Sequence, residues 1–370
     1  MRFTAVMLAV AAAMVASSLP AVQAASYCVK HNLSVVHEAC SYYNDYVQVD
    51  FNQTFNQTGW DVITVTPTPT ALQNLPDAYY YAGYLEGYVT VDTIWATYSN
   101  SIAKLYDVTP AMAKWVDDHM TYMQLQSKVS DGDDNFWAQV GYIMRQIKGL
   151  QAGYQLAQTD PAKALNYSQM FWLSFQWEFD DVALALNRTE AKQMTYKAKP
   201  GHCSALIKLT ANDLFMAHLS WTNFNYMLRQ FKTYNFQTTV SMSGYPGVVH
   251  SIDDWYMTSN RLTVQETTNL LYNNSLYDNV TPQSTSEFIR VMAANYLSTN
   301  GADWMRYVQI SNSGTYNNQW MVVDMKLVNP LAADNMTKIP DGTLWVYEQL
   351  PDPYGRFADV SHVLRDNGMW

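Results

Sequence analysis

The spacing of apolar residues along this sequence differs on the two sides of a polar segment. This difference is the strongest constraint on the fold class. Upstream, residues 136–154 place apolar side chains at steps of three and four, the period of one helix face. Downstream, in CSALIKL at residues 203–209, apolar and polar side chains nearly alternate, which is typical of a strand. Residues 187–202 between them are polar, and we expect an exposed linker. The chain therefore needs both helices and a sheet, and we predict an α+β fold.

The part upstream of the linker is predicted to be mainly helical. Its clearest helix follows the N-cap candidates Asp134 and Asn135. Helical spacing also starts at Asp77, whereas residues 25–70 look rich in loops. The acidic cluster 131–135 lacks the Gly and Glu offsets of an EF-hand, so we interpret it as a capped turn and not as a calcium site. The apolar face of the clearest helix consists of Phe136, Val140, Ile143, Ile147, Leu150 and Tyr154.

The part downstream of the linker is predicted to mix strands with helices. The strand at 203–209 and a returning strand at 214–218 flank a turn at 211–213, which predicts a hairpin with Cys203 at its open end. Leu206 interrupts the alternation of the first strand and indicates burial on both faces. Further expected elements are a short helix around Met227, Leu228 and Phe231 and core strands over 320–328 and 343–350.

The first 24 residues have the pattern of a signal peptide. Arg2 supplies the basic start, residues 5–16 are uninterruptedly apolar, and residues 22–24 offer small side chains for cleavage, which places the mature start near Ala25. An uncleaved membrane anchor is the alternative, but the apolar stretch is short for a bilayer. The leader predicts a secreted or lysosomal protein.

Composition narrows the class of partner. A hydrophobic content of 48% with only 15% charged residues indicates a folded body, not a disordered chain. The net charge of -10 disfavours nucleic acid, which selects basic surfaces. Eight Asn-x-Ser/Thr motifs in a chain with a leader predict surface glycosylation. These asparagines are Asn32, Asn52, Asn56, Asn166, Asn187, Asn273, Asn279 and Asn335.

The three cysteines separate into a pair and a single residue. Cys28 and Cys40 are close in sequence, and in an oxidising compartment a disulfide between them is the expectation, worth roughly 2–3 kcal/mol through loop entropy. Cys203 is left over. An unpaired cysteine in a secreted protein is buried and inert, paired with another molecule, or a reactive thiol.

The position of Cys203 suits an N-terminal nucleophile. In that chemistry the chain cuts itself before the cysteine, here at the His202–Cys203 bond, and the new α-amine acts as base for the adjacent thiol. The pKa of a free α-amine, about 7.7–8.0, is near neutrality and suits that task. Gly201 would allow the strained turn that self-cleavage requires.

Several long blocks of this sequence resemble the phospholipase B-like proteins. They are GHCSALIKL, NDLFMAHLSWTNFNYMLRQFKTYNF, SGYPGVVHSIDDWYMTSNRLTVQETT and NSGTYNNQWMVVD, with GYLEGYVTVDTIWATYSN and NFWAQVGYIMRQIKGLQAGY upstream. The resemblance extends from about Cys28 to the last residue. It implies a secreted or lysosomal glycoprotein with the αββα sandwich of the Ntn hydrolases.

The resemblance also implies roles for individual residues. Cys203 matches the nucleophile that autocleavage exposes, and His218 and Trp221 in AHLSW match residues that line its pocket. Thr268, the second Thr of QETT, matches a residue that contacts the reacting carbonyl. A hydrogen-bonded structural histidine is the alternative for His218, and an ordinary strand threonine is the alternative for Thr268. We interpret the adjacent asparagines in GTYNNQW as part of a turn.

Two features depart from the family pattern. His202 stands where the family usually has a small or polar residue. Family members continue well past the segment that ends here at Trp370, and they carry an asparagine and an arginine there that complete the pocket. We therefore expect a truncated product, in which the sandwich is incomplete.

The predicted organisation is a signal peptide over 1–24, a mainly helical part over 25–186, an exposed linker over 187–202 and an α/β part over 203–370. The predicted function is hydrolysis of acyl chains from phospholipids through Cys203, with contact to a membrane surface. An amidase acting on N-acyl lipids and an inactive glycoprotein that binds a lipid or a partner are the alternatives. Neither a Gly-x-Ser-x-Gly elbow nor an HExxH or Cys-x-x-Cys motif occurs, so we expect no serine-lipase site, metal or other cofactor.

Overall fold

The computed structural model describes residues 23–30, 36–37, 40, 45–129, 135–187, 203–328 and 338–370. The leader up to residue 22, most of the predicted linker including His202, most of the acidic cluster, and the sequons at Asn32 and Asn335 lie outside the described residues. Helices and a large mixed sheet both occur among the described residues, which confirms the predicted α+β class.

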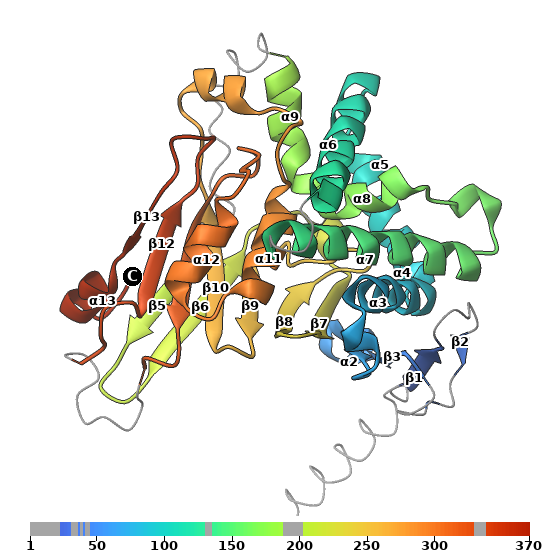
Figure 1. Ribbon diagram of the computed structural model, residues 1–370, viewed down its shortest axis with the longest axis horizontal. Helices are drawn as coiled ribbons and strands as arrows, with labels where there is room; N and C mark the ends of the chain where they lie inside the picture. Colours follow the sequence, from blue (N-terminus) through green and yellow to red (C-terminus); the bar gives the residue numbers. More distant parts are fainter. Residues whose placement is uncertain are drawn as a thin grey trace, which may run out of the picture.

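A large mixed sheet runs across the molecule (Figure 1). Its strand order among the described residues is β13-β12-β11-β10-β9-β8-β7-β4-β3-β1-β2. Every neighbouring pair is antiparallel except β4 and β7, which lie parallel and join the strands before the linker to those after it. The strands are β1 Gln23–Val29, β2 Val36–His37, β3 Val47–Gln53, β4 Trp60–Pro67, β7 Arg229–Asn235, β8 Thr239–Gly244, β9 Trp255–Thr258, β10 Leu262–Thr268, β11 Asn318–Asp324, β12 Leu344–Glu348 and β13 Arg356–Asp359.

Two local predictions were wrong, because alternating burial of β-branched or apolar side chains makes these segments strands. Residues 25–70 are not mainly loop, because β1, β3 and β4 lie there. In β4 the side chains alternate between half-buried and buried, and its Thr, Val and Ile suit a pleated sheet, while Pro67 only ends the strand. The short helix expected near Met227 is replaced by a 3₁₀ turn and then by β7, whose side chains also alternate.

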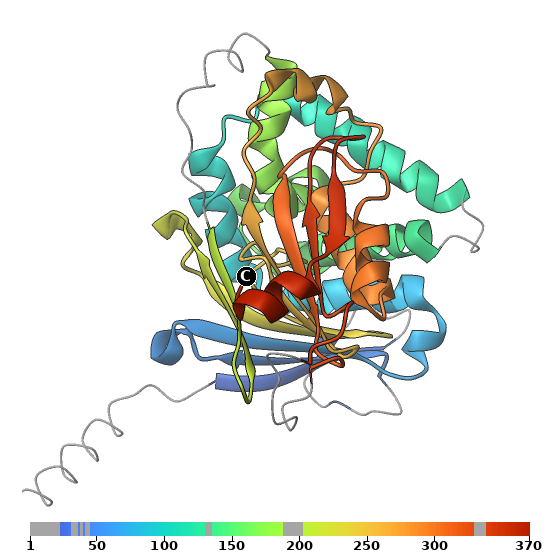
Figure 2. The ribbon, with the colours of Figure 1, turned by 90° about the vertical axis from the view of Figure 1, so that its left-hand side faces the viewer.

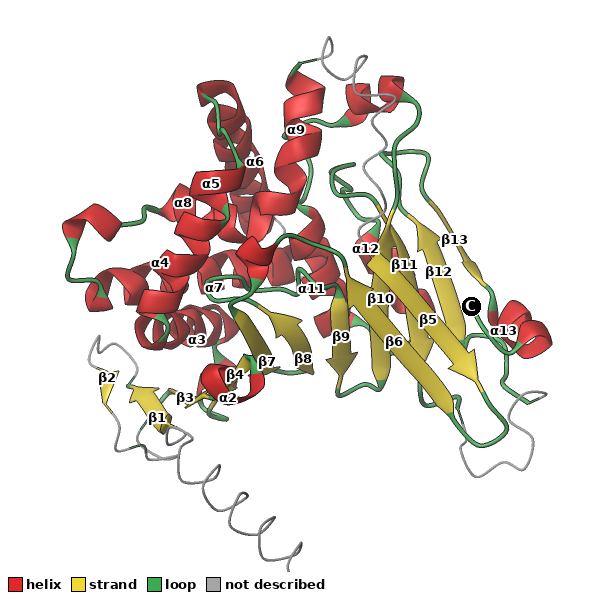
Figure 3. Ribbon diagram, turned by 180° about the vertical axis from the view of Figure 1, so that it is seen from behind, coloured by secondary structure: helices red, strands yellow, loops and turns green. Residues whose placement is uncertain are grey.

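Helices cover one face of this sheet and surround one end of it (Figures 1 and 3). The predicted helix over 136–154 is confirmed as part of α7, and the expected core strands correspond to β11 and β12. The helices are α2 Phe55–Thr58, α3 Leu75–Val89, α4 Val91–Asn100, α5 Ile102–Leu105, α6 Pro110–Val129, α7 Asn135–Ala157, α8 Tyr167–Phe175, α9 Phe179–Leu186, α11 Glu287–Leu297, α12 Gly301–Val308 and α13 Ser361–Asn367.

A buried ion pair joins the helical layer to the sheet. Lys232 on β7 and Glu86 on α3 are both fully buried, with Nζ 2.5 Å from Oε1. The Tyr234 hydroxyl donates to Glu86 Oε2 at 2.8 Å, and Lys232 also donates to the carbonyl of Val248. Because each charge is satisfied by several partners, this cluster fixes how α3 sits on the sheet.

A two-stranded hairpin packs on the opposite face of the sheet (Figure 3). It is formed by β5, Cys203–Leu209, and β6, Leu214–Ser220, as predicted, with Cys203 opposite Ser220 at the open end. Burial on both faces of β5 was a wrong prediction, because Leu206 is 42% exposed and only the inward face packs on the sheet. In the described residues, the second layer of the predicted sandwich is this hairpin alone.

The edge of β5 that faces away from β6 is hydrogen-bonded to the C-terminal residues. Ile207 and Trp370 exchange both backbone hydrogen bonds, and Leu209 N–H donates to the carbonyl of Gly368. Figure 2 shows α13 and the C-terminus beside this hairpin. The C-terminal segment therefore holds β5 in place on the side away from β6.

The predicted disulfide between Cys28 and Cys40 is formed. Five of the six sequon asparagines in the described residues are exposed, and Asn52 on β3 is half-buried. Among the described residues, we find no helix that is both long and apolar enough to cross a membrane.

Candidate active site

The open end of the hairpin brings three titratable side chains together. Cys203 begins β5, and His218 lies opposite Ala205, so both side chains project from the same face toward β10. A sulfur of Cys203, a ring nitrogen of His218 and a carboxylate oxygen of Glu266 lie within 4.8 Å of one another. Cysteine and histidine were predicted from the sequence, whereas Glu266 was not.

Glu266 is the buried acid of this group. It lies on β10, is fully buried, and neither of its carboxylate oxygens makes a hydrogen bond of normal geometry with a described residue. His218 Nε2 lies 3.0 Å from the backbone carbonyl of Glu266 and 3.9 Å from Oε1. Because a carbonyl oxygen only accepts, Nε2 carries the proton and donates it to that carbonyl.

Burial dominates the electrostatics of the group. Desolvation raises the pKa of Glu266 to about 7, and nearby Asp254, Cys203 and Thr268 offset part of that rise. Desolvation, reinforced by the charges of Glu266 and Asp254, raises the pKa of the Cys203 thiol, while the backbone N–H of Trp221 opposes the rise. Burial lowers the pKa of His218. The thiol and the imidazole are therefore both neutral in this form of the chain.

A second acid lies behind Glu266. Asp254 is fully buried, and its pKa is raised well above the usual range by desolvation and by Glu266 and Glu287. The Tyr316 hydroxyl donates to Asp254 Oδ2 at 2.7 Å. Asp254 and Tyr316 have φ of 53° and 44°, which is left-handed backbone that costs about 1–3 kcal/mol per residue. Such strain is typical of functional sites.

The outer side of Cys203 opens onto aromatic side chains. The opening is about 10 Å³, room for about one water molecule, and Trp177, Trp221, Tyr245 and Tyr316 contribute to its wall. Trp221 follows β6 directly and is 58% exposed. The structure therefore places the predicted residues Cys203 and Trp221 at this opening, while His218 lies beside Cys203 in the group with Glu266.

Thr268 lies on the inner side of the same group. It ends β10 two residues after Glu266, so both side chains leave the strand on one face. Among the described residues, its buried hydroxyl has no hydrogen-bond partner, and neither do the two side-chain amide atoms of Asn318, which lies opposite Thr268 on β11. Unpaired buried polar atoms at a site are candidates for binding a substrate's polar group.

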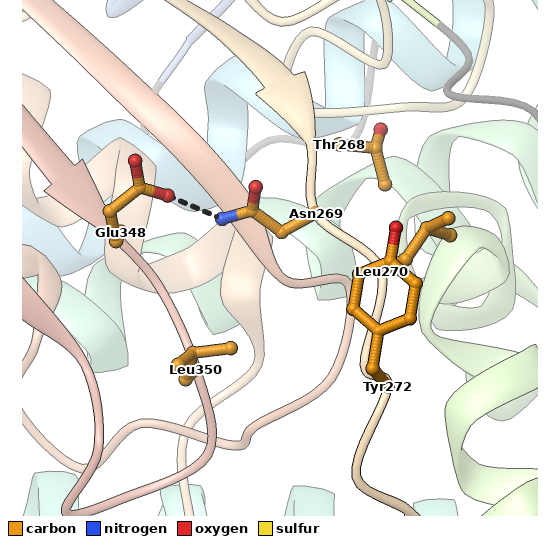
Figure 4. Close-up of a pocket in the computed structure, with 6 residues that line it drawn as sticks. All are labelled: Thr268, Asn269, Leu270, Tyr272, Glu348 and Leu350. Atoms are coloured by element: carbon orange, nitrogen blue, oxygen red, sulfur yellow. Dashed lines mark hydrogen bonds between the residues drawn. The ribbon is translucent and has the colours of Figure 1, made fainter.

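Thr268 also borders a pocket of about 370 Å³. Figure 4 shows this pocket, in which Asn269 Nδ2 donates to Glu348 Oε2 at 2.9 Å and the ring of Tyr272 lies on the other side. Leu270 and Leu350 supply its apolar lining. Thr268 is thus shared between the cysteine group and a cavity that can hold a small organic group.

Sulfur, nitrogen and oxygen ligands of this kind also suit zinc, so Cys203, His218 and Glu266 are the described residues that could hold a metal. The sequence motifs did not predict this cluster. The signal that could have identified Glu266 is a single carboxylate in the otherwise uncharged strand LTVQETT, since a buried charge must be paired, protonated or functional. Asp254 and Tyr316 gave no comparable signal, because their backbone conformation and contacts are tertiary.

Comparison with known proteins gives one consistent family. The family model "Phospholipase B" matches residues 47–370. The chain is 35% identical to phospholipase B-like protein B and 34% identical to phospholipase B-like protein A, both of Dictyostelium discoideum, over 87% and 88% of its length. It is 31% identical to phospholipase B-like 1 of Rattus norvegicus over 92% of its length. These alignments cover 59%, 61% and 66% of the respective relatives, so the chain spans about three fifths of their length.

Proposed function

Because this chain belongs to the phospholipase B-like family, we propose that it is a hydrolase whose nucleophile is Cys203. The observation that carries this assignment is the grouping of the thiol with His218 and buried Glu266 at the open end of the hairpin. The His202–Cys203 bond is cut by the chain itself. The new α-amine of Cys203 then acts as base for its own thiol, so the histidine is not required to be that base.

In turnover, the α-amine takes the thiol proton and Sγ attacks the acyl carbonyl of the substrate. The carbonyl oxygen gains negative charge, and the Trp221 backbone N–H and the Thr268 hydroxyl are the donors available beside it. The leaving group departs with the proton, which gives a thioester on Cys203. Water then hydrolyses that thioester and restores the free thiol.

The substrate is the acyl ester of a phospholipid, or in the alternative an N-acyl lipid amide. Several apolar side chains near the site are exposed and suit contact with a lipid surface: Leu219 is 67% exposed, Trp221 58% and Phe224 90%. The leader and the exposed sequons support a secreted or lysosomal glycoprotein. Nucleic acid is not a partner.

The same exposed side chains favour a second function, an inactive glycoprotein that binds lipid or a partner. Phe215 and Leu219 project from the outer face of β6, away from the sheet, and Phe224 follows in the next turn. Binding of this kind requires no cleavage at Cys203. Whether the purified chain is cleaved before Cys203 therefore distinguishes the two functions.

Fragment masses after incubation at pH 5 and at pH 7.5 test the nucleophile. We expect a new N-terminus at Cys203 in the wild-type chain and none in Cys203→Ala. The cleaved protein should then release fatty acid from phosphatidylcholine or from an N-acyl amide, which decides the substrate class. A wild-type chain that stays intact at both pH values would refute the cysteine mechanism, and lipid-vesicle binding by that intact chain would support the second function.

A further inference from the structure

The base proposed for turnover, the α-amine of Cys203, is not available for self-cleavage. Before the His202–Cys203 bond breaks, the nitrogen of Cys203 is an amide and cannot act as a base. The thiol is neutral in the intact chain because burial and neighbouring acids raise its pKa. Another group must therefore take the thiol proton in the first round of chemistry.

Most of the groups near the thiol are already committed to other partners. His218 Nε2 donates to the Glu266 carbonyl, and burial lowers the pKa of the ring, which disfavours adding a proton to its other nitrogen. Asp253 binds Arg229 at 3.1 Å and the Tyr245 hydroxyl at 2.7 Å. Asp254 Oδ2 accepts from Tyr316, and although its Oδ1 has no hydrogen-bond partner among the described residues, Asp254 is not part of the group that lies within 4.8 Å around Sγ. Only Glu266 combines proximity to Sγ with two carboxylate oxygens that lack a hydrogen bond of normal geometry among the described residues.

We propose that Glu266 takes the proton from the Cys203 thiol during self-cleavage and passes it to the departing Cys203 nitrogen, an inference that rests on the proposed cysteine mechanism. The thiolate sulfur attacks the carbonyl carbon of His202, and the C–N bond breaks as the nitrogen receives the proton. The products are a free α-amine and a thioester between His202 and Sγ. Water hydrolyses the thioester to the His202 carboxylic acid and the thiol.

Titratable groups face Glu266 from several elements. Asp254 before β9, Glu287 on α11, Tyr256 on β9 and Tyr316 before β11 all have pKa values raised well above their usual range, mainly by burial. Cys203 and His218 face it from the hairpin, where burial raises the pKa of the thiol and lowers that of the imidazole. Geometry selects Glu266 among these groups, because its carboxylate lies within 4.8 Å of Sγ. Burial also raises the pKa of Glu266 to about 7, so that this acid can both accept and return a proton near neutral pH.

The rate of self-cleavage in variants tests this role. The wild-type rate should rise with pH to a plateau, with a midpoint near pH 7. Glu266→Gln should slow cleavage about 100-fold or more and abolish the midpoint, because an amide accepts no proton. Glu266→Asp should keep a pH-dependent, slower cleavage. Glu178→Gln is the matched control, since Glu178 is also buried with a pKa raised to about 7 but does not contact Cys203, and it should cleave like wild type.

The outcomes separate this role from the nucleophile itself. Cleavage of Glu266→Gln at the wild-type rate, with Cys203→Ala intact, overturns the role of Glu266 and leaves the nucleophile in place. A wild-type chain that never cleaves overturns both. Circular dichroism melts establish that each variant is folded. If Glu266→Gln does not fold, Glu266→Asp decides. Slower cleavage with a shifted midpoint supports Glu266 as the acceptor, whereas the wild-type rate and midpoint overturn that role.

Discussion

Buried carboxylic acids are the distinctive feature of this protein at the scale of single residues. Glu178, Asp254, Glu266 and Glu287 are all buried, and burial raises the pKa of each. Arg290 is a buried cation that lowers the pKa of Glu178 and Glu287 in part. An acid kept neutral by burial stabilises the fold only while it holds its proton, so these residues link stability to pH.

At Glu178 the dependence of stability on pH can be measured at a buried acid that is separate from the Cys203 group. Its Oε2 accepts from the Thr315 and Ser313 hydroxyls and from the backbone of Glu287, and its pKa is raised from 4.5 to about 7, mainly by burial. Since the folded pKa is higher than the unfolded one, its contribution is complete below pH 4.5 and is lost as pH rises through 7. Between those values the wild type should lose about 3 kcal/mol of unfolding free energy relative to Glu178→Gln.

Urea unfolding of both proteins at pH 4.5, 6 and 7.5 measures this difference. The same substitution at Glu348, which is exposed on β12, is the control for the chemical change itself. Parallel stability curves for wild type and Glu178→Gln would mean that Glu178 is ionised in the folded protein.

At the scale of elements, α3 and α7 pack so closely that their backbones touch. Glycines repeat at a spacing of four on both helices, Gly83 and Gly87 on α3 and Gly149 and Gly153 on α7. A Cβ on Gly149 would lie 1.8 Å from the carbonyl oxygen of Tyr80, and a Cβ on Gly83 would lie 1.9 Å from that of Gln146. On each helix, glycine therefore stands at the positions where the backbone of the other helix comes closest.

Gly149→Ala should lower the free energy of unfolding by about 3 kcal/mol, because the obstructing atom belongs to the backbone and cannot rotate away. Gly141→Ala on the same helix is the matched control. Its Cβ would meet the Ser127 side chain at 3.1 Å, and alanine favours the helix, so stability should stay within about 1 kcal/mol of wild type. Thermal unfolding of the two variants compares them, and equal melting temperatures would contradict the close helix contact.

Some helices and strands were predicted correctly from the sequence and others were not. The helix over 136–154 and the hairpin beginning at Cys203 were predicted because their apolar periods directly report which face is buried. Strands β3 and β4 were missed, since polar threonines and nearby prolines suggested loops although every second residue of β4 is buried. The short helix near Met227 was wrong because three apolar residues fit either period, and pairing of β7 with β4 and β8 decides between them.

At the scale of the whole molecule, the sheet is shared between the two sides of the proposed cleavage site. β4 pairs with β7 from Trp60↔Arg229 to Val65↔Tyr234. The Lys232–Glu86 ion pair crosses the same boundary. The disulfide lies wholly upstream and Cys203 is unpaired, so no covalent bond in the described structure would join the two fragments after cleavage.

The fragments produced by cleavage before Cys203 should therefore remain together. We expect them to elute as one species of the intact protein's size in native gel filtration, and to separate in a denaturing gel without reductant. Uncleaved Cys203→Ala gives the reference position in both experiments. Separation of the fragments in native buffer would show that the shared sheet does not hold them.

By itself the sequence determined the α+β class, the hairpin with Cys203 at its open end and the family, because local period, turn residues and long matching blocks are properties of contiguous residues. Only the tertiary structure decided that Glu266 and Asp254 lie near the Cys203 thiol and that β4 runs parallel to β7. Those contacts join residues about 50 to 170 positions apart. They depend on strand register and on packing of the hairpin against β10, which no local pattern encodes.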